Sequence, residues 1–192
     1  MLVIELRFLI GRFHSTPWGR NVNEGVPEWP PSPYRLVRAL YDAWKRKRPD
    51  WQESRVRPLI EALSATAPRF SLPRATASHV RAYLNQNGKD VTDKQKVFDA
   101  FVALDPAARV VIGWDGVVLE PAEQADLQDL LSTLNYLGRS ESWIAARLLS
   151  TGPSIWNCTP AGEASSPDTE RIPVACPIPA PNYAGQPYIP TP

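Results

Sequence analysis

The chain has 192 residues, 43% of them hydrophobic; this suits one folded domain with an extension, and the lack of any run of eighteen apolar residues argues against a membrane span. Its net charge of +1 is unevenly distributed, with +5 on residues 1–48, +3 on residues 49–98, −6 on residues 99–142 and −1 on residues 143–192. A basic half beside an acidic one indicates a polyanion-binding surface and a separate surface that is solvated or faces a protein; ordinary surface charge is the alternative.

The first segment with strand periodicity is residues 2–10. Every second side chain is apolar, and the intervening set includes Glu5 and Arg7. This alternation predicts a half-exposed strand that carries Arg7 on the face away from the core. A loop of about twenty residues follows, far longer than a simple connection needs. Because Trp18 and Trp29 argue against disorder, we interpret this loop as a functional segment.

The next elements are two helices and a strand. Residues 32–48 predict a helix with Ser32 as its N-cap, and residues 53–65 predict a weaker second helix. Residues 78–85 alternate again and predict the second strand. Residues 85–108 are interpreted as a long excursion rather than a tight turn.

The last elements complete a recognisable order. Residues 109–114 predict a buried strand, residues 121–137 a helix ended by Gly138, and residues 142–149 the closing strand. Two split βαβ units in this order predict an α+β, ferredoxin-like (RRM-like) sandwich over residues 1–150, with helices on one sheet face and the other face free to bind a ligand.

The C-terminal segment has a different composition. Ten of the 21 prolines fall within residues 151–192, which we interpret as an extended tail or an interdomain linker. Cys158 and Cys176 have no His or second Cys at metal-ligand spacing, so we expect no zinc site. Two lone thiols without an export signal are typical of a cytoplasmic protein.

Candidate catalytic groups are few. The histidines are His14 and His79, no Gly-rich phosphate loop is present, and no group of acids has metal-ligand spacing. We therefore predict neither a metal nor another cofactor. Metal-free RNA cleavage could use either histidine as an acid or a base, although a lone histidine is more often a polar contact.

Binding of single-stranded RNA has more support, because basic side chains bind phosphates and flat side chains stack on bases. Glu5 and Arg7 on the first strand argue against base stacking on the sheet face, so the loops are expected to carry the contacts. Trp29, which prolines surround, is expected to plug the loop onto the core. The candidate RNA contacts are Arg7, Arg12, His14, Trp18, Arg20, Arg35, Arg38, His79 and Arg81.

Three motifs carry a resemblance to a known family. "RFHSTPWGRNVNEGVPEWPPSPYRLVRAL", "TASHVRAY" and "LNYLGRSESW", all within residues 7–143, resemble the Cas-five half of the Cas-five/Cas-six fusion protein of type I-G (formerly I-U) CRISPR systems. The resemblance implies a ferredoxin-like subunit that grips the 5′ handle of CRISPR RNA. It also implies a position at one end of the Cascade backbone, beside the backbone and large subunits, with target DNA contacted only indirectly.

The resemblance adds further candidate residues. A thumb hairpin between the second and third strands kinks the guide RNA in the family, and the excursion at 85–108 has that place. Its candidate contacts are Lys89, Lys94, Lys96 and Phe98. Arg139 and Ser140, in the turn before the last strand, either contact a phosphate or only form the turn.

The sequence leaves two alternatives open. In the family's fusion protein the Cas-six half cleaves precursor RNA, and we expect that half to lie beyond the tail, which leaves this chain non-catalytic. The first alternative is a metal-independent endoribonuclease that acts from His14 or His79. The second is a protein-interaction module whose basic half docks onto an acidic neighbouring subunit.

Overall fold

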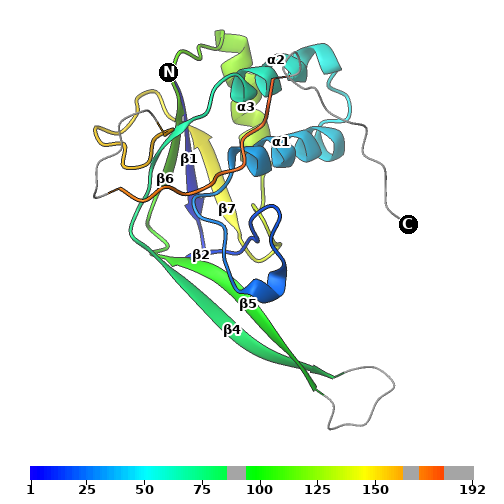
Figure 1. Ribbon diagram of the computed structural model, residues 1–192. Coiled ribbons are helices and arrows are strands. Elements are labelled where there is room, and N and C mark those ends of the chain that lie inside the picture. The colour runs from blue at the N-terminus through cyan, green and yellow to red at the C-terminus, as the bar shows by residue number, and fades with distance from the viewer. Residues whose placement is uncertain (86–93, 162–168, 180–192) are drawn as a thin grey trace.

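The computed structural model describes residues 1–85, 94–161 and 169–179, and Figure 1 shows their arrangement. Over these ranges the chain is α+β, with three α-helices and two antiparallel sheets. The helices are α1 (Pro33–Lys47), α2 (Glu53–Ser64) and α3 (Pro121–Ser132), and a 3-10 turn, η1, spans Val22–Glu24. None of them is long and apolar enough to cross a membrane.

The main sheet has four strands in the spatial order β3-β6-β1-β7. They span Arg69–Ser71, Val110–Trp114, Leu2–Phe8 and Ile144–Leu148 respectively. The central strand β1 is antiparallel to both of its neighbours, and β3 is antiparallel to β6. Because α1 and α2 connect β1 to β3, and α3 connects β6 to β7, the two βαβ units interleave. This topology is compatible with the predicted ferredoxin-like fold.

The core lies between this sheet and the helices. Cross-strand partners such as Ile4 and Ile112 share one face, and both are fully buried. Trp114 is fully buried on the same face, and its Nε1 donates a hydrogen bond to the carbonyl oxygen of Leu63 in α2 at 3.0 Å. Burying an aromatic ring together with its satisfied N–H fixes α2 against the sheet.

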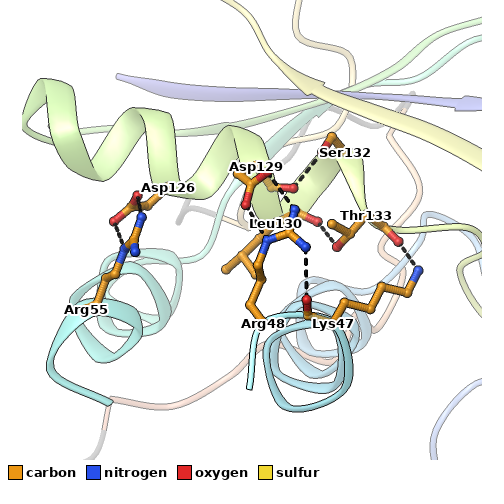
Figure 2. A network of polar contacts seen from close by, with 8 residues as sticks. All are labelled: Lys47, Arg48, Arg55, Asp126, Asp129, Leu130, Ser132 and Thr133. Carbon is orange, nitrogen blue, oxygen red and sulfur yellow. Dashed lines mark hydrogen bonds and ion pairs between the residues drawn. The ribbon is translucent and has the colours of Figure 1, made fainter. Parts of the chain in front are cut away.

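Figure 2 shows polar contacts that fasten α3 to the other helices. Arg48, at the end of α1, donates two hydrogen bonds to Asp129, at 2.7 and 2.9 Å. Arg55 of α2 pairs in the same two-bond manner with Asp126, and Lys47 donates to the carbonyl oxygen of Thr133. The acidic helix therefore uses basic partners from its own chain.

A second sheet, in the order β2-β5-β4, forms the most extended part of the molecule. Its strands are β2 (Arg12–Phe13), β5 (Lys94–Leu104) and β4 (Ala75–Asn85). Eleven residues of β4 pair with eleven of β5, so the ribbon is about 35 Å long. In Figure 1 it extends away from the helices, while its base pairs with β2 beside the body.

The predicted second strand at 78–85 was assigned to the wrong sheet. Those residues belong to β4 of the ribbon, and the core strand in that position is the three-residue β3. Alternation shows that a segment is a strand with one polar face, but it does not show which sheet the strand joins. The excursion expected at 85–108 likewise contains the long strand β5.

The predicted end of the third helix was also wrong. The helix ends at Ser132, with Thr133 as its C-cap, although Leu134 and Leu137 are still buried beyond it. Gly138 has a left-handed φ of +87° and lies in the turn before β7, not at the helix end. A Cβ at Gly138 would stand 2.5 Å from the carbonyl oxygen of His14, so the close approach of these two segments requires glycine.

The described parts of the C-terminal segment pack against the body. Cys158 forms a β-bridge with Phe70, beside the edge strand β3, and the carbonyl oxygen of Ala175 accepts a hydrogen bond from the Tyr34 amide at 3.2 Å. The Trp156 ring lies against Gly113 of β6, where a Cβ would meet it at 2.4 Å. The sheet face that we expected to be free is therefore covered by Trp156 at one end.

Candidate nucleic-acid interface

One face of the ribbon carries a group of basic and aromatic side chains. In an antiparallel pair, directly opposite residues share a face, and so does every second residue along a strand. Arg81 lies opposite Phe98, and Tyr83 lies opposite Lys96. Together with His79, these residues form what we call the hairpin cluster: His79, Arg81, Tyr83, Lys96 and Phe98.

Phe98 is the centre of the hairpin cluster. The Arg81 guanidinium lies 5.5 Å from the centroid of the Phe98 ring, the Lys96 ammonium lies 4.7 Å from it, and the His79 ring centroid is 5.8 Å away. These are cation–π distances for the two charged groups. Tyr83 is 62% exposed farther along β4. Phe98 itself is half-buried. Cations around a partly exposed ring can bind phosphates while the ring stacks on a base.

The cations of the hairpin cluster have no acidic partners among the described residues. Neither Arg81 nor Lys96 makes an ion pair there, whereas Arg57 of α2 is bound to Glu53 at 2.9 Å. Lys94, at the start of β5, is exposed. Lys89 lies outside the described residues. The positive charge of this face is therefore available to an external anion.

A second basic and aromatic surface lies beside α1. A groove of about 490 Å³, which we call the α1 groove, runs between α1, the loop after β2 and the segment that follows α3. Trp18 is 76% exposed at this groove, and its ring meets that of Tyr34 edge-on at 5.9 Å between centroids. Arg38 lies 5.7 Å from the centre of the Tyr34 ring. Tyr136 also lines the groove.

The arginines of the α1 groove differ in whether they form an ion pair with an acidic side chain. Arg38 is exposed and makes no ion pair with a described residue. Arg46 pairs with Asp42 at 2.8 Å. Arg35 donates to both oxygens of the buried Glu28, at 2.8 and 3.1 Å, and also to the carbonyl oxygen of Thr16. Arg35 therefore anchors the loop to α1, while Arg38 is free to bind a ligand.

The two tryptophans of the long loop have different surroundings. Trp29 is partly buried against the core, with its ring centroid 6.4 Å from that of Phe13, as expected for a plug. Trp18 is the exposed one. Arg20 pairs with Glu24 at 3.0 Å, and the η1 turn that follows it packs against β5. The loop thus joins the α1 groove to the ribbon.

His14 is not on the surface. The residue is 1% exposed, and both ring nitrogens face carboxylates: Nδ1 lies 2.5 Å from Glu141 Oε1, and Nε2 lies 2.9 Å from Asp99 Oδ1. Arg139 Nη1 lies 3.0 Å from the same oxygen of Asp99. A buried ring held in this way does not reach an RNA, so the prediction that His14 contacts RNA directly is wrong.

His14, Asp99 and Glu141 are also residues that could offer ligands to a cation, because one ligand atom from each lies within 4.8 Å of the others. The two carboxylates, however, face different nitrogens of the ring. A single ion bound to one nitrogen would not meet both carboxylates in this geometry, and Arg139 already occupies Asp99. We therefore describe the group as an ion-pair network.

The open sheet face carries three arginines near a buried glutamate. Glu5 is 3% exposed; it accepts a hydrogen bond from Arg147 at 2.8 Å and forms an ion pair with Arg109 at 3.3 Å. Contact with Glu5 raises the pKa of the Arg147 guanidinium further, so this group stays charged. Arg7 lines the same hollow of about 310 Å³ and makes no ion pair with a described residue. The prediction that Arg7 points away from the core is confirmed.

The other predicted contacts are spread over these surfaces. Arg12 lies 4.2 Å from the centroid of the Phe101 ring, on the ribbon. Arg139 is bound to Asp99, and exposed Ser140 is within 3.5 Å of Glu141. The structure brings together the predicted residues of the hairpin cluster and, separately, those of the α1 groove.

Sequence reasoning missed several members of these sites. It did not single out Tyr83, Tyr34, Tyr136, Arg109 and Arg147, nor the acids Asp99 and Glu141. For Tyr83 the signal was present, because it stands two residues after Arg81 on the same face of a predicted strand. Asp99 and Glu141 lie 85 and 127 positions from His14, and no local pattern connects them.

No family model matches this chain, and no curated protein matches it either.

Proposed function

We propose that this chain is an RNA-binding subunit of a CRISPR effector complex, which grips the 5′ handle of CRISPR RNA and caps the backbone of a type I-G Cascade assembly. The proposal joins the resemblance of three sequence motifs to a surface with the chemistry of a single-stranded RNA site. Neighbouring backbone and large subunits would be its protein partners, and target DNA would be contacted only through the assembly.

The single observation that carries this proposal is the hairpin cluster. Phe98 offers a ring for base stacking, and Arg81 and Lys96 stand over that ring without an acidic partner in the described part of the chain. Stacking on an aromatic ring contributes about 1–3 kcal/mol per base and tolerates different base sequences. Cations beside the ring bind the phosphates that flank the stacked base.

The position of the ribbon supports a thumb-like role. It is inserted between β3 and β6, which are the second and third strands of the main sheet in chain order. The resemblance places the guide-kinking hairpin of the family at this point. A ribbon that extends beyond the body can reach an RNA that also lies against the α1 groove, since the loop carrying Trp18 and η1 connects the two surfaces.

An endoribonuclease activity of this chain is less well supported. His14 is buried between two carboxylates, so it is not available as a general acid or base to an RNA at the surface. His79 is exposed beside Phe98, but the other histidine of the sequence is the buried His14, so no second histidine is available to act with it. We therefore assign His79 to binding.

The test is a titration of the chain with RNA of its host's CRISPR repeat at several salt concentrations, in EDTA. We expect affinity to fall steeply with salt, because phosphate neutralisation releases counterions. Arg81→Ala and Lys96→Ala should each reduce the slope of log affinity against log salt by about 0.7, the value for one contact to a single strand.

Arg57→Ala is the matched control, because Arg57 is exposed but paired with Glu53. Its salt slope should equal that of the wild type. An unchanged slope in both hairpin variants would contradict the RNA site on the ribbon. Equal affinity for a scrambled RNA would contradict handle recognition, and cleaved RNA on a denaturing gel would move catalysis into these 192 residues.

A further inference from the structure

His14 lies where three distant segments of the chain meet. Its backbone follows β2, Asp99 lies midway along β5 of the ribbon, opposite Val80, and Glu141 belongs to the turn before β7. The amide of His14 donates to Ser142 Oγ at 2.7 Å, and the carbonyl oxygen of His14 accepts from the Arg139 amide at 2.9 Å. Both the ring and the backbone of His14 therefore contact the turn, and the ring alone reaches the ribbon.

Hydrogen-bond chemistry restricts the protonation state that fits this geometry. A neutral imidazole has one N–H donor and one acceptor nitrogen, and an ionised carboxylate only accepts. With a neutral ring, one of the two carboxylates would face a nitrogen lone pair. Only the imidazolium ion donates to Glu141 and to Asp99 at the same time.

The charges around the ring balance when the ring is an imidazolium ion. The charged groups that face it are Asp99 from β5 and Glu141 from the turn, and Arg139 of the same turn is bound to Asp99. Burial raises the pKa of the Glu141 carboxyl, but its own backbone hydrogen bond and its contacts with His14 and Arg139 together lower it by more. Glu141 therefore stays ionised to a lower pH than an ordinary glutamate.

We propose that His14, as an imidazolium ion, is a positioning residue that fastens the ribbon to the body at the middle of β5. Asp99 directly follows Phe98 along β5, so the contact that holds Asp99 also sets where Phe98 is presented. Removing the proton from His14 would turn one of the two hydrogen bonds into a repulsive contact, and the ribbon would loosen. The consequence for RNA binding rests on the proposed function, but the fastening itself does not.

The protonation state can be measured directly on the full chain. Nitrogen-15 NMR of labelled histidine reports each ring nitrogen, and a His79→Gln variant leaves His14 as the remaining histidine. At pH 7 we expect both His14 nitrogens to carry protons, with a spectrum that EDTA does not change. A single neutral tautomer at pH 7, or a spectrum that responds to EDTA, would overturn the proposal.

Glu141→Gln tests the mechanism without removing the histidine. The Gln amide can donate to Nδ1 while Nε2–H donates to Asp99, so a neutral ring is satisfied and no proton is needed. The readout is hydrogen exchange of the amides that join β2 to β5, among them Leu104, which donates to the carbonyl oxygen of Gly11. Glu61→Gln, at an exposed glutamate of α2, is the matched control.

Protection is the intrinsic exchange rate of an amide divided by its observed rate at each pH. In the wild type and in the control, protection should fall about tenfold or more between pH 6 and pH 9. A hydrogen bond to a charged group changes the closed-to-open equilibrium by more than about tenfold, and this bond is lost when His14 loses its proton. In Glu141→Gln the protection should not depend on pH. Equal pH profiles in the wild type and Glu141→Gln, or no pH dependence in the wild type, would overturn the fastening.

Repeat-RNA affinity over the same pH range separates this inference from the proposed function. If RNA affinity falls together with protection in the wild type and does not depend on pH in Glu141→Gln, the result supports both the fastening and the proposed function. Protection that depends on pH in a protein that binds no RNA would support the fastening and contradict the proposed function. The His79→Gln background removes any pH effect of the hairpin cluster itself.

Discussion

The helical layer and the ribbon are both basic, but they use their cations differently. Arg48 and Arg55 in the helical layer are each held by two hydrogen bonds to an aspartate of α3 (Figure 2). On the ribbon, Arg81 and Lys96 lie over the Phe98 ring without an acidic partner in the described residues. Charge that is already paired holds the fold together, and charge that is unpaired is available to a polyanion.

The ion pairs also explain why the uneven distribution of charge along the sequence does not correspond to separate acidic and basic surfaces. Residues 99–142 carry eight acids, and we expected a separate acidic surface there. Five of the eight instead form ion pairs with basic residues of the same chain: Asp99, Asp115, Asp126, Asp129 and Glu141. Much of the acidic half therefore neutralises the basic half, and the surface left for a polyanion is smaller than the charge count indicates.

The largest effect is expected on the ribbon, from Phe98→Ala. Removal of the ring loses the stacking surface, which contributes about 1–3 kcal/mol per base, so repeat-RNA affinity should fall roughly 5- to 150-fold. The salt slope should stay the same, because no cation is removed.

Val80→Ala is the control for this change, since Val80 is 47% exposed on β4 and lies opposite Asp99, outside the hairpin cluster. Affinity can be measured by fluorescence anisotropy and the fold by circular dichroism. Equal RNA affinity of the two variants would show that Phe98 does not contact RNA. The ribbon would then not differ from the helical layer as a surface for RNA.

The next effect is expected within the helical layer itself, where Arg38 and Arg48 lie on or next to α1. Arg38 has no ion pair with a described residue, so Arg38→Ala should lower the salt slope by about 0.7 and weaken RNA binding severalfold. Arg48→Ala should leave the slope unchanged, because its guanidinium is bound to Asp129. Equal slopes in these two variants would show that ion pairing does not decide which arginines contact RNA.

Much of the helical framework could be predicted from the sequence. Ser32 was placed as the N-cap of α1, and its Oγ accepts the Arg35 amide at 3.3 Å, with Pro33 in the first turn. Such signals are local, since a cap and an apolar stripe lie within one segment. The strand β3 was missed because three residues are too few to produce a periodic pattern.

The site was predicted in part, and the missing part depended on contacts between distant residues. His14 was singled out as a surface contact, but its burial and its two acidic partners follow from the packing of β5 and the turn before β7. His79 and Arg81, in contrast, belong to a segment whose alternation predicts a strand, and they lie on one face of β4. Phe98 and Lys96 are candidates only through the thumb that the resemblance implies, and the structure shows them as neighbours on one face of β5. A pattern within one strand can be read from the sequence, whereas a pairing across more than eighty residues cannot.

A smaller effect is expected when the acids of α3 are neutralised. The double change Asp126→Asn with Asp129→Asn releases Arg55 and Arg48 from their ion pairs. Two cations without an ion pair should then strengthen binding to any single-stranded RNA about twofold or more at low salt and steepen the salt slope.

Glu120→Gln with Glu123→Gln is the matched control for this double change, because it neutralises two acids at the start of α3 that form no ion pair with a described residue. Identical salt slopes for the two double variants would contradict the view that pairing withholds these arginines from a ligand.

The smallest effect concerns the acid stability of the helical layer. The hydrogen bond from Arg48 holds the pKa of the Asp129 carboxyl below its ordinary value of 3.8, although burial acts in the opposite direction. A carboxyl with a lowered pKa in the folded state adds stability above the unfolded-state pKa and loses it as the pH falls through the folded-state value. The Tm of Asp129→Asn should therefore lie below that of the wild type near neutral pH and approach it below about pH 4. Glu61→Gln should follow the wild type throughout, and a constant difference in Tm between Asp129→Asn and the wild type at every pH would show that the ion pair is not the cause.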